Sequence, residues 1–166
     1  MNPVDVNPFA AHDCNNLGSS PQATNILHTP VMARLEHVGI AVGDPGPVTK
    51  LLESLLGLTP YKTEIVEREG VRTHFLDAGT VKVELLEALD DDSPVARFLR
   101  KRGEGIHHLS FEVEDVQAAI DRGRSMGLQP LSEEPLSGAD GKRVVFFHPR
   151  DTHGILIEVC EAGGEG

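Results

Sequence analysis

Two histidines and two glutamates occupy matched positions in two related parts of the chain. His37 lies in the run LEHVGIAV and His108 lies at the same phase of the run IHHLSFEV. Each part ends about 50 residues later in a strand-like run that carries one glutamate, Glu84 in the first and Glu158 in the second. A duplicated unit that supplies one imidazole and one carboxylate twice predicts a metal site shared between two halves.

Two imidazoles and two carboxylates suit a borderline or hard divalent ion such as Co²⁺, Mn²⁺, Ni²⁺, Fe²⁺ or Zn²⁺. An octahedral ion with four protein ligands keeps two open positions, enough to bind two oxygen atoms of a substrate. A single histidine in a strand is more often structural than a ligand, but four residues in matched positions are harder to explain that way. The only cysteines, Cys14 and Cys160, have no short spacing, so neither a thiolate metal site nor a disulfide framework is expected.

The alternation of apolar residues decides which side chains share the site, because successive residues of a strand point to opposite faces. His37 and His108 each alternate with aliphatic or aromatic residues, so both are expected to face away from the helix-covered core. His107 has the core-facing phase and is therefore not expected to be a ligand. Glu84 and Glu158 also fall opposite the apolar positions of their strands.

Two strand–helix–strand–strand–strand units are predicted to carry these residues. In each, an aspartate seven residues after the histidine (Asp44, Asp115) can cap a helix, and a later glycine (Gly57, Gly127) can end it. The strands of the first unit are expected near residues 35–42, 59–67, 72–78 and 81–88. The strands of the second unit are expected near residues 106–113, 129–133, 142–148 and 154–160. A linker helix is expected from the Ser93 cap.

The predicted fold class is α/β (α+β), with two βαβββ modules whose curled mixed sheets surround a shared metal-binding cup. One domain is expected over residues 34–161, with module one at about 34–90, the linker helix at about 93–102 and module two at about 106–161. Residues 1–33 contain no Lys or Arg and show no periodic apolar pattern, which predicts a disordered N-terminal extension. Residues 162–166 are expected to form a flexible tail.

The formal net charge of −11 argues against a nucleic-acid partner and against docking on an anionic membrane. No apolar run approaches the roughly 20 residues that a transmembrane helix needs. Neither a secretory signal nor a transit peptide is recognisable, and two cysteines without a short spacing favour a reducing compartment. We therefore expect a cytoplasmic protein that acts on a small molecule.

Four segments of the chain resemble one known family. They are the runs DDSPVARFL, GEGIHHLSFEV, SEEP continuing to GADGK, and FFHPRDTHGILIE. In this order and spacing, and with the paired units, residues 34–161 resemble the methylmalonyl-CoA epimerases of the vicinal oxygen chelate superfamily, which includes glyoxalase I. The resemblance does not extend to residues 1–33.

The resemblance implies a site, a cofactor and an activity. The ligands would be His37, His108 as the second residue of the His-His pair, Glu158, and Glu84 where relatives have Gln or Glu. The activity would be interconversion of (2R)- and (2S)-methylmalonyl-CoA by proton transfer through an enolate, with Co²⁺ as the first choice of metal and Mn²⁺, Ni²⁺ or Zn²⁺ as alternatives. Glu158 is the first candidate for a catalytic acid or base. The partner would be a small acyl-CoA substrate, and a homodimer is expected.

Epimerisation also calls for an acid or base on the second face of the substrate, and here the chain departs from part of the family. Some relatives have Glu in the strand after a Glu-Gly-Val turn, where this chain has Thr73. A water held by the ion, Glu87 or Glu133 could serve instead, and the sequence does not choose among them.

Other readings remain open at this stage. His74 and His148 could each take a direct role, and His148 could line a pocket mouth. The loop SGADGKR at residues 137–143 could be either a hairpin turn or an anion-contacting loop. A glyoxalase I-type enzyme acting on a thiol hemithioacetal is the nearest rival function. A metal-free ligand-binding protein of the same superfamily is another, and a ring-cleaving dioxygenase is less favoured because that chemistry pairs with two His and one carboxylate.

Overall fold

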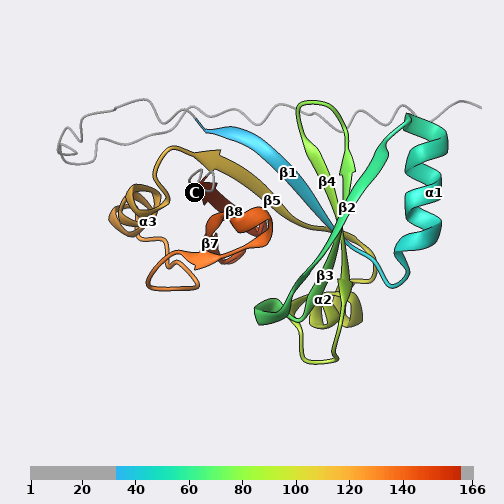
Figure 1. The fold of residues 1–166 in the computed structure, drawn as a ribbon. Coiled ribbons are helices and arrows are strands. Elements are labelled where there is room, and N and C mark those ends of the chain that lie inside the picture. The colour runs from blue at the N-terminus through green and yellow to red at the C-terminus, as the bar shows by residue number, and fades with distance from the viewer. Residues whose placement is uncertain (1–32, 162–166) are drawn as a thin grey trace, which may run out of the picture. The chain divides into compact units, whose positions relative to one another are not determined.

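The computed structural model describes residues 33–161 of the 166-residue chain (Figure 1). The predicted flexible tail and, apart from residue 33, the predicted N-terminal extension lie outside the described residues. The strands are β1 (Arg34–Ala41), β2 (Thr59–Val66), β3 (Val71–Asp77), β4 (Lys82–Ala88), β5 (Gly105–Val113), β6 (Leu136–Ser137), β7 (Arg143–Phe147) and β8 (Ile157–Glu161). The helices are α1 (Pro45–Leu56), α2 (Pro94–Arg102) and α3 (Val116–Ser125), with 3₁₀ turns η1 (Glu67–Glu69) and η2 (Ala139–Gly141).

All the strands join one curled sheet in the order β2-β3-β4-β1-β5-β8-β7-β6. At its centre β1 and β5 run antiparallel to each other, and each has a parallel neighbour on its outer side, β4 and β8 respectively. The order β4-β3-β2 on one side therefore corresponds to β8-β7-β6 on the other (Figure 1). This arrangement confirms the predicted α+β fold of two βαβββ modules.

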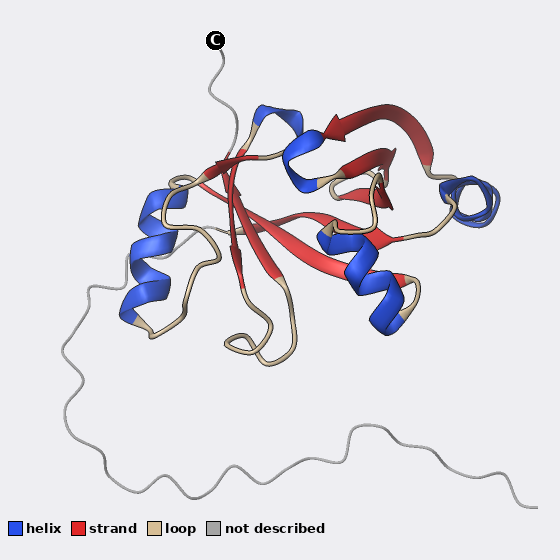
Figure 2. Ribbon diagram, turned by 90° about the horizontal axis from the view of Figure 1, so that it is seen from below, coloured by secondary structure: helices blue, strands red, loops and turns tan. Residues whose placement is uncertain are grey.

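The helices begin where the predicted capping residues stand. The Asp44 carboxylate accepts a hydrogen bond from the Gly46 N–H at 2.9 Å, and the Asp115 carboxylate accepts one from the Ala118 N–H at 3.0 Å. The Ser93 hydroxyl accepts from the Ala96 N–H and so caps α2. Figure 2 shows the helices at the periphery of the unit with the strands between them.

Each helix packs on its own group of buried apolar side chains. The group under α1 contains Val42, Leu76 and Leu85, and the group under α3 contains Val145 and Phe147. The third group lies under α2 and contains Ala41, Val71, Leu86 and Val95. The helices thus hold the sheet in its curled form from outside, and part of the α2 group also forms a wall of the central cavity.

Two strand predictions in the second module were wrong. No strand forms at residues 129–133, where Pro130 makes only an isolated bridge to Phe147, and β6 appears later, at Leu136–Ser137. Pro130 and Pro135 have no N–H to donate, which interrupts a continuous ladder there. The last strand begins at Ile157 rather than near residue 154, because Gly154 has φ 93° and lies in a turn. Across residues 33–161, no helix is long and apolar enough to cross a membrane.

Candidate metal centre

The sheet register brings the two halves of the predicted site together. His37 on β1 pairs with Ser110 on β5, and Ser110 in turn pairs with Glu158 on β8. His108 on β5 pairs with Gly39 on β1, and Gly39 in turn pairs with Glu84 on β4. In each half, a histidine on one central strand therefore lies opposite a small residue on the other central strand, and that small residue lies beside a glutamate on the next strand. All four predicted ligands are buried, with 4–6 % of each residue exposed.

Two imidazoles and one carboxylate converge as a set of metal ligands would. The Nε2 atoms of His37 and His108 lie 2.8 Å apart. The Glu158 oxygens lie 3.6 Å from His108 Nε2 and 3.9 Å from His37 Nε2. Two donors bound at right angles to one ion at about 2.1 Å would lie about 3 Å apart. The described residues thus present three donors at separations close to those of a divalent metal site.

Glu84 lies at the same centre but on the other side of the His37 ring. Its Oε1 atom is 3.4 Å from His37 Nδ1, so its nearest described partners among possible ligands are His37 and Glu36, not His108 and Glu158. The structure therefore brings three of the four predicted ligands together around the Nε2 atoms. Glu84 as the fourth ligand stays a prediction that requires its side chain to turn toward them.

Glu36 is a buried residue of this centre that the strand alternation did not predict. Its Oε2 atom lies 2.5 Å from His37 Nδ1, and its Oε1 atom lies 2.8 Å from Lys82 Nζ and 3.0 Å from Lys142 Nζ. Burial works to raise the pKa of Glu36, but the hydrogen bonds from His37 and the two lysines outweigh it and lower that pKa. Glu36 is therefore a carboxylate that accepts from His37 Nδ1–H and leaves the Nε2 lone pair free for an ion.

A β-bulge explains how Glu36 reaches the centre. The pairing of β1 with β5 shifts by one residue between Leu35 and His37, so Glu36 is the extra residue. A bulge changes the direction of the side chains at that point of a strand. Consecutive residues Glu36 and His37 can therefore both be buried at the site.

His107 contacts the ring of the predicted ligand His108 on its Nδ1 side. Its Nδ1 atom lies 3.1 Å from His108 Nδ1, and its ring packs edge-on against Phe98 with centroids 5.0 Å apart. Burial lowers the pKa of His107 to about 4, so the ring is neutral and can accept a hydrogen bond from His108 Nδ1–H. Glu36 and His107 thus play equivalent parts for the two predicted ligands.

Gly39 leaves the space that His108 occupies. A Cβ atom at Gly39 would lie 2.3 Å from Cε1 of His108 and 2.7 Å from both ring nitrogens. In the matching position of the second module stands Ser110, whose hydroxyl donates to Glu158 Oε1 at 2.8 Å. The two halves therefore differ at this pair of positions: one makes room for a ring and the other holds a carboxylate.

The charges of the centre fit a divalent cation. Burial raises the pKa of Glu84 to about 7, against the attraction of the His37 ring, and burial also raises the pKa of Glu158. Burial works to lower the pKa of His37, but the Glu36 hydrogen bond and the charges of Glu84 and Glu158 outweigh it. Two buried carboxyl groups with raised pKa values are poorly compensated by one imidazole, and a bound divalent ion would supply the missing positive charge.

The ligand set lies in a cavity of about 50 Å³. The residues that line it outside the centre include Glu69, Thr73, Gly138, Ala139 and Lys142. The loop at residues 137–143 therefore belongs both to the β6–β7 hairpin and to the wall of the cavity. Sequence reasoning missed Glu69, although the turn Glu69-Gly70 that places it was recognisable.

The remaining candidates lie outside this cavity. His74 contacts Glu87 at 3.2 Å, and Glu133 pairs with Arg124 while its side chain is 93 % exposed. His148 lines an adjoining groove of about 410 Å³ together with apolar residues and two cations, Lys101 and Arg102. The groove and the cavity share His107 and His108 as lining residues.

Comparison with known proteins places this architecture in a described group. Residues 36–146 match the glyoxalase/bleomycin resistance protein/dioxygenase superfamily. The chain is 40% identical to the ethylmalonyl-CoA/methylmalonyl-CoA epimerase of Cereibacter sphaeroides, over 78% of this chain and 98% of that protein. It is 38% identical to the mitochondrial methylmalonyl-CoA epimerase of Homo sapiens, over 79% of this chain and 75% of that protein. Among solved structures, a single-residue variant of Streptomyces coelicolor methylmalonyl-CoA epimerase in complex with 2-nitronate-propionyl-CoA has a TM-score of 0.74 and 36% identity, covering 79% of this chain and 95% of that one.

Proposed function

The chain belongs to the glyoxalase/bleomycin resistance protein/dioxygenase superfamily and, within it, to the methylmalonyl-CoA epimerase family, and on this premise we propose that it interconverts (2R)- and (2S)-methylmalonyl-CoA. The observation that carries the proposal is the buried convergence of His37, His108 and Glu158 in one cavity of a chain so similar to these enzymes. A 2-nitronate-propionyl group, as bound by the Streptomyces relative, has the planar anionic form of an enolate.

The residues of the centre fit a resident divalent ion, for which Co²⁺ is our first choice and Mn²⁺, Ni²⁺ or Zn²⁺ are alternatives. His37, His108 and Glu158 would hold it, with Glu84 as the fourth ligand. When bound, the ion would act as a Lewis acid that stabilises the negative charge of an enolate oxygen. Glu36 and His107 would fix the orientation of the two imidazoles through their Nδ1 atoms.

The surroundings of Glu158 support a role in proton transfer at the edge of this centre. Without the ion, burial raises the pKa of Glu158 against the opposing effects of His37 and Ser110, which makes the carboxylate a stronger base than an exposed one. Ser110 holds Oε1 by a hydrogen bond, so the orientation of the carboxyl group is fixed. We propose that Glu158 removes or returns the proton at C2 on one face of the substrate.

The groove beside the cavity suits the long arm of an acyl-CoA. Its walls include the apolar side chains of Phe98, Ile106 and Ile155, and Lys101 and Arg102 also line it. An extended thioester arm could lie along the apolar part while its phosphates approach the cations. A homodimer and a cytoplasmic location, both predicted from the sequence, remain predictions that accompany this proposal.

The experiment is deuterium exchange at C2 of methylmalonyl-CoA in D₂O, followed by NMR or mass spectrometry. Protein treated with a chelator should lose the exchange, and added Co²⁺ or Mn²⁺ should restore it. Glu158→Gln should abolish the exchange of at least one of the two epimers, whereas Glu87→Gln, which changes a carboxylate outside the cavity, should not. Absence of exchange with metal-loaded protein, or turnover of a methylglyoxal–thiol adduct instead, would contradict the proposal and favour a glyoxalase I-type function.

A further inference from the structure

Inversion at C2 needs a proton carrier on each face of the substrate, and Glu158 accounts for one face only. We propose that Glu69, in the turn η1, is the proton carrier for the second face. This inference rests on the proposed epimerase function. It replaces the three alternatives that the sequence left open, a water held by the ion, Glu87 and Glu133.

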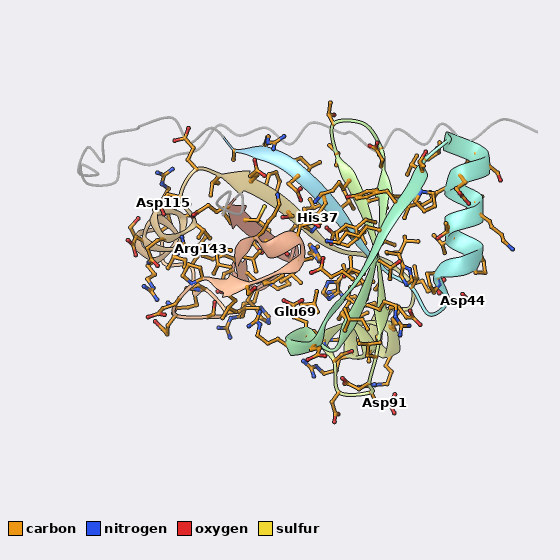
Figure 3. The ribbon with its side chains drawn as sticks, in the orientation of Figure 1. His37, Asp44, Glu69, Asp91, Asp115 and Arg143 are labelled. Carbon is orange, nitrogen blue, oxygen red and sulfur yellow. The ribbon has the colours of Figure 1, made fainter. Side chains whose placement is uncertain are left out.

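Glu69 and Glu158 reach the same cavity from opposite sides of the central β1–β5 strand pair. Both residues line the cavity. Glu69 belongs to the β2–β3 hairpin on one side of the central β1–β5 pair, whereas Glu158 lies on β8 on the other side. Figure 3 shows Glu69 beside η1, on the side of the turn toward the middle of the unit, where His37 is also labelled. A substrate carbon held between them would present one face to each carboxyl group.

The other titratable groups that line the cavity are already committed. Glu36 is bound by Lys82, Lys142 and His37, which leaves neither it nor the two lysines free for proton transfer. The remaining ones are the predicted ligands and His107, whose low pKa makes it a poor proton donor. Thr73 also lines the wall, but its hydroxyl does not titrate in the useful range. Among the described lining residues, Glu69 is the carboxyl group left for this task.

The backbone holds Glu69 in a defined place. The N–H of Gly70 donates to the Glu67 carbonyl at 3.0 Å, and the Gly70 carbonyl accepts from the Leu89 N–H at 2.8 Å. Gly70 has φ 61°, and a Cβ atom there would lie 2.4 Å from a carboxylate oxygen of Asp90. The turn is therefore fixed against the end of β4, which keeps the backbone of Glu69 beside the cavity.

The surroundings of Glu69 also suit proton transfer. Its side chain is 30 % exposed, and its partner is the neighbouring Arg68 at 3.2 Å. Burial raises the pKa of Glu69 against the opposing charge of Arg68, and its charge in turn contributes to raising the pKa of Glu158.

The reaction then balances without any further reactant. One carboxylate takes the C2 proton as the C–H bond breaks, and the electron pair moves into the thioester carbonyl to give the enolate. The other carboxyl group releases its proton, and a new C–H bond forms on the opposite face. Glu69 and Glu158 exchange protonation states in each turnover and are reset through solvent.

The test separates exchange from inversion by using each pure epimer in D₂O with the metal-loaded full-length protein. With Glu69→Gln, epimerisation should fall at least 100-fold, while one epimer still exchanges its C2 proton within about threefold of the wild-type rate through Glu158. The KM for methylmalonyl-CoA should stay within about threefold. Glu67→Gln, in the same turn but outside the cavity lining, is the matched control and should behave as wild type. In a Glu69→Ala variant, added formate should restore part of the epimerisation.

The outcomes are distinguishable. If the wild-type protein neither exchanges nor epimerises, the proposed function itself is wrong. If the wild type is active and Glu69→Gln epimerises normally, the function stands and the role of Glu69 is refuted. Loss of both exchange and epimerisation in folded, metal-loaded Glu69→Gln and Glu69→Ala, without rescue by formate, would also refute it.

Discussion

The close approach of His108 to the backbone of Gly39 gives a sharp test of the metal centre. In a Gly39→Ala variant the new Cβ would lie 2.3 Å from His108 Cε1. Carbon atoms in contact are normally about 3.5–4.0 Å apart, so the imidazole must move by more than about 1 Å. The ring is packed edge-on against Phe146, and His108 is only 5 % exposed, so it can move only by leaving this contact and its place beside His37.

A displacement of this size exceeds what a ligand can tolerate, since metal–ligand distances vary by only about 0.2 Å between good sites. We expect Gly39→Ala to weaken Co²⁺ or Mn²⁺ binding by about 100-fold or more, which corresponds to about 2.7 kcal/mol. Competition with a chromophoric chelator measures the affinity directly. Thermal unfolding of the metal-free variant reports separately whether the fold has been damaged.

Gly43→Ala is the matched control, because a Cβ atom there meets only a Glu104 carboxylate oxygen at 3.4 Å. This variant should bind metal as tightly as wild type. The reasoning would be refuted if a folded Gly39→Ala protein retained wild-type affinity, since His108 would then not be a ligand held against β1.

Three further predictions concern the same centre and its groove. His108→Ala should abolish stoichiometric metal binding. His107→Ala should weaken metal binding only about 10- to 100-fold, because it removes the partner of His108 Nδ1 and not a predicted ligand. Metal analysis after dialysis distinguishes the two variants. In the metal-free protein, burial raises the pKa of Glu84 from 4.5 to about 7, so the folded protein holds this proton more tightly than the unfolded chain does. The contribution of Glu84 to the free energy of unfolding is therefore full below about pH 4.5 and is lost as the pH rises toward about 7. Urea titrations should therefore show wild type losing about 3 kcal/mol relative to Glu84→Gln over that range, and parallel curves would contradict the shift. Replacing Lys101 and Arg102 by Ala should raise the KM for methylmalonyl-CoA about 3- to 10-fold at low salt and leave kcat unchanged; an unchanged KM would exclude the groove as the path of the acyl-CoA arm.

The burial of the four candidate ligands at one centre could be predicted from the sequence because it depends on a strict local rule. Side chains of a strand alternate with a period of two, and apolar residues mark the core face. That rule favours His108 over His107 and associates Glu84 and Glu158 with the same face; all four predicted ligands line the cavity, and so does His107. Whether Glu84 is a ligand depends on its rotamer, which alternation does not determine.

Residues placed by pairing irregularities could not be predicted. Alternation assigns Glu36 to the core side, but a bulge opposite β5 directs it to the site, and the register of a partner strand is not visible in a local sequence pattern. The strand expected at residues 129–133 failed for a related reason, since Pro130 and Pro135 interrupt the ladder that apolar neighbours alone would favour. Glu69 was recognised only as part of a turn, and its place in the cavity depends on how the β2–β3 hairpin curls.

The difference between Gly39 and Ser110 has a kinetic consequence. The two epimers of the proposed substrate differ only at C2, so their equilibrium constant is close to one, and the ratio of kcat/KM in the two directions must equal it. A site whose halves were identical would satisfy this condition trivially. Here Gly39 leaves space for the His108 ring in one half, whereas Ser110 donates a hydrogen bond to the Glu158 carboxylate in the other. The forward and reverse reactions should therefore differ in kcat and in KM by compensating factors. Their primary isotope effects need not match.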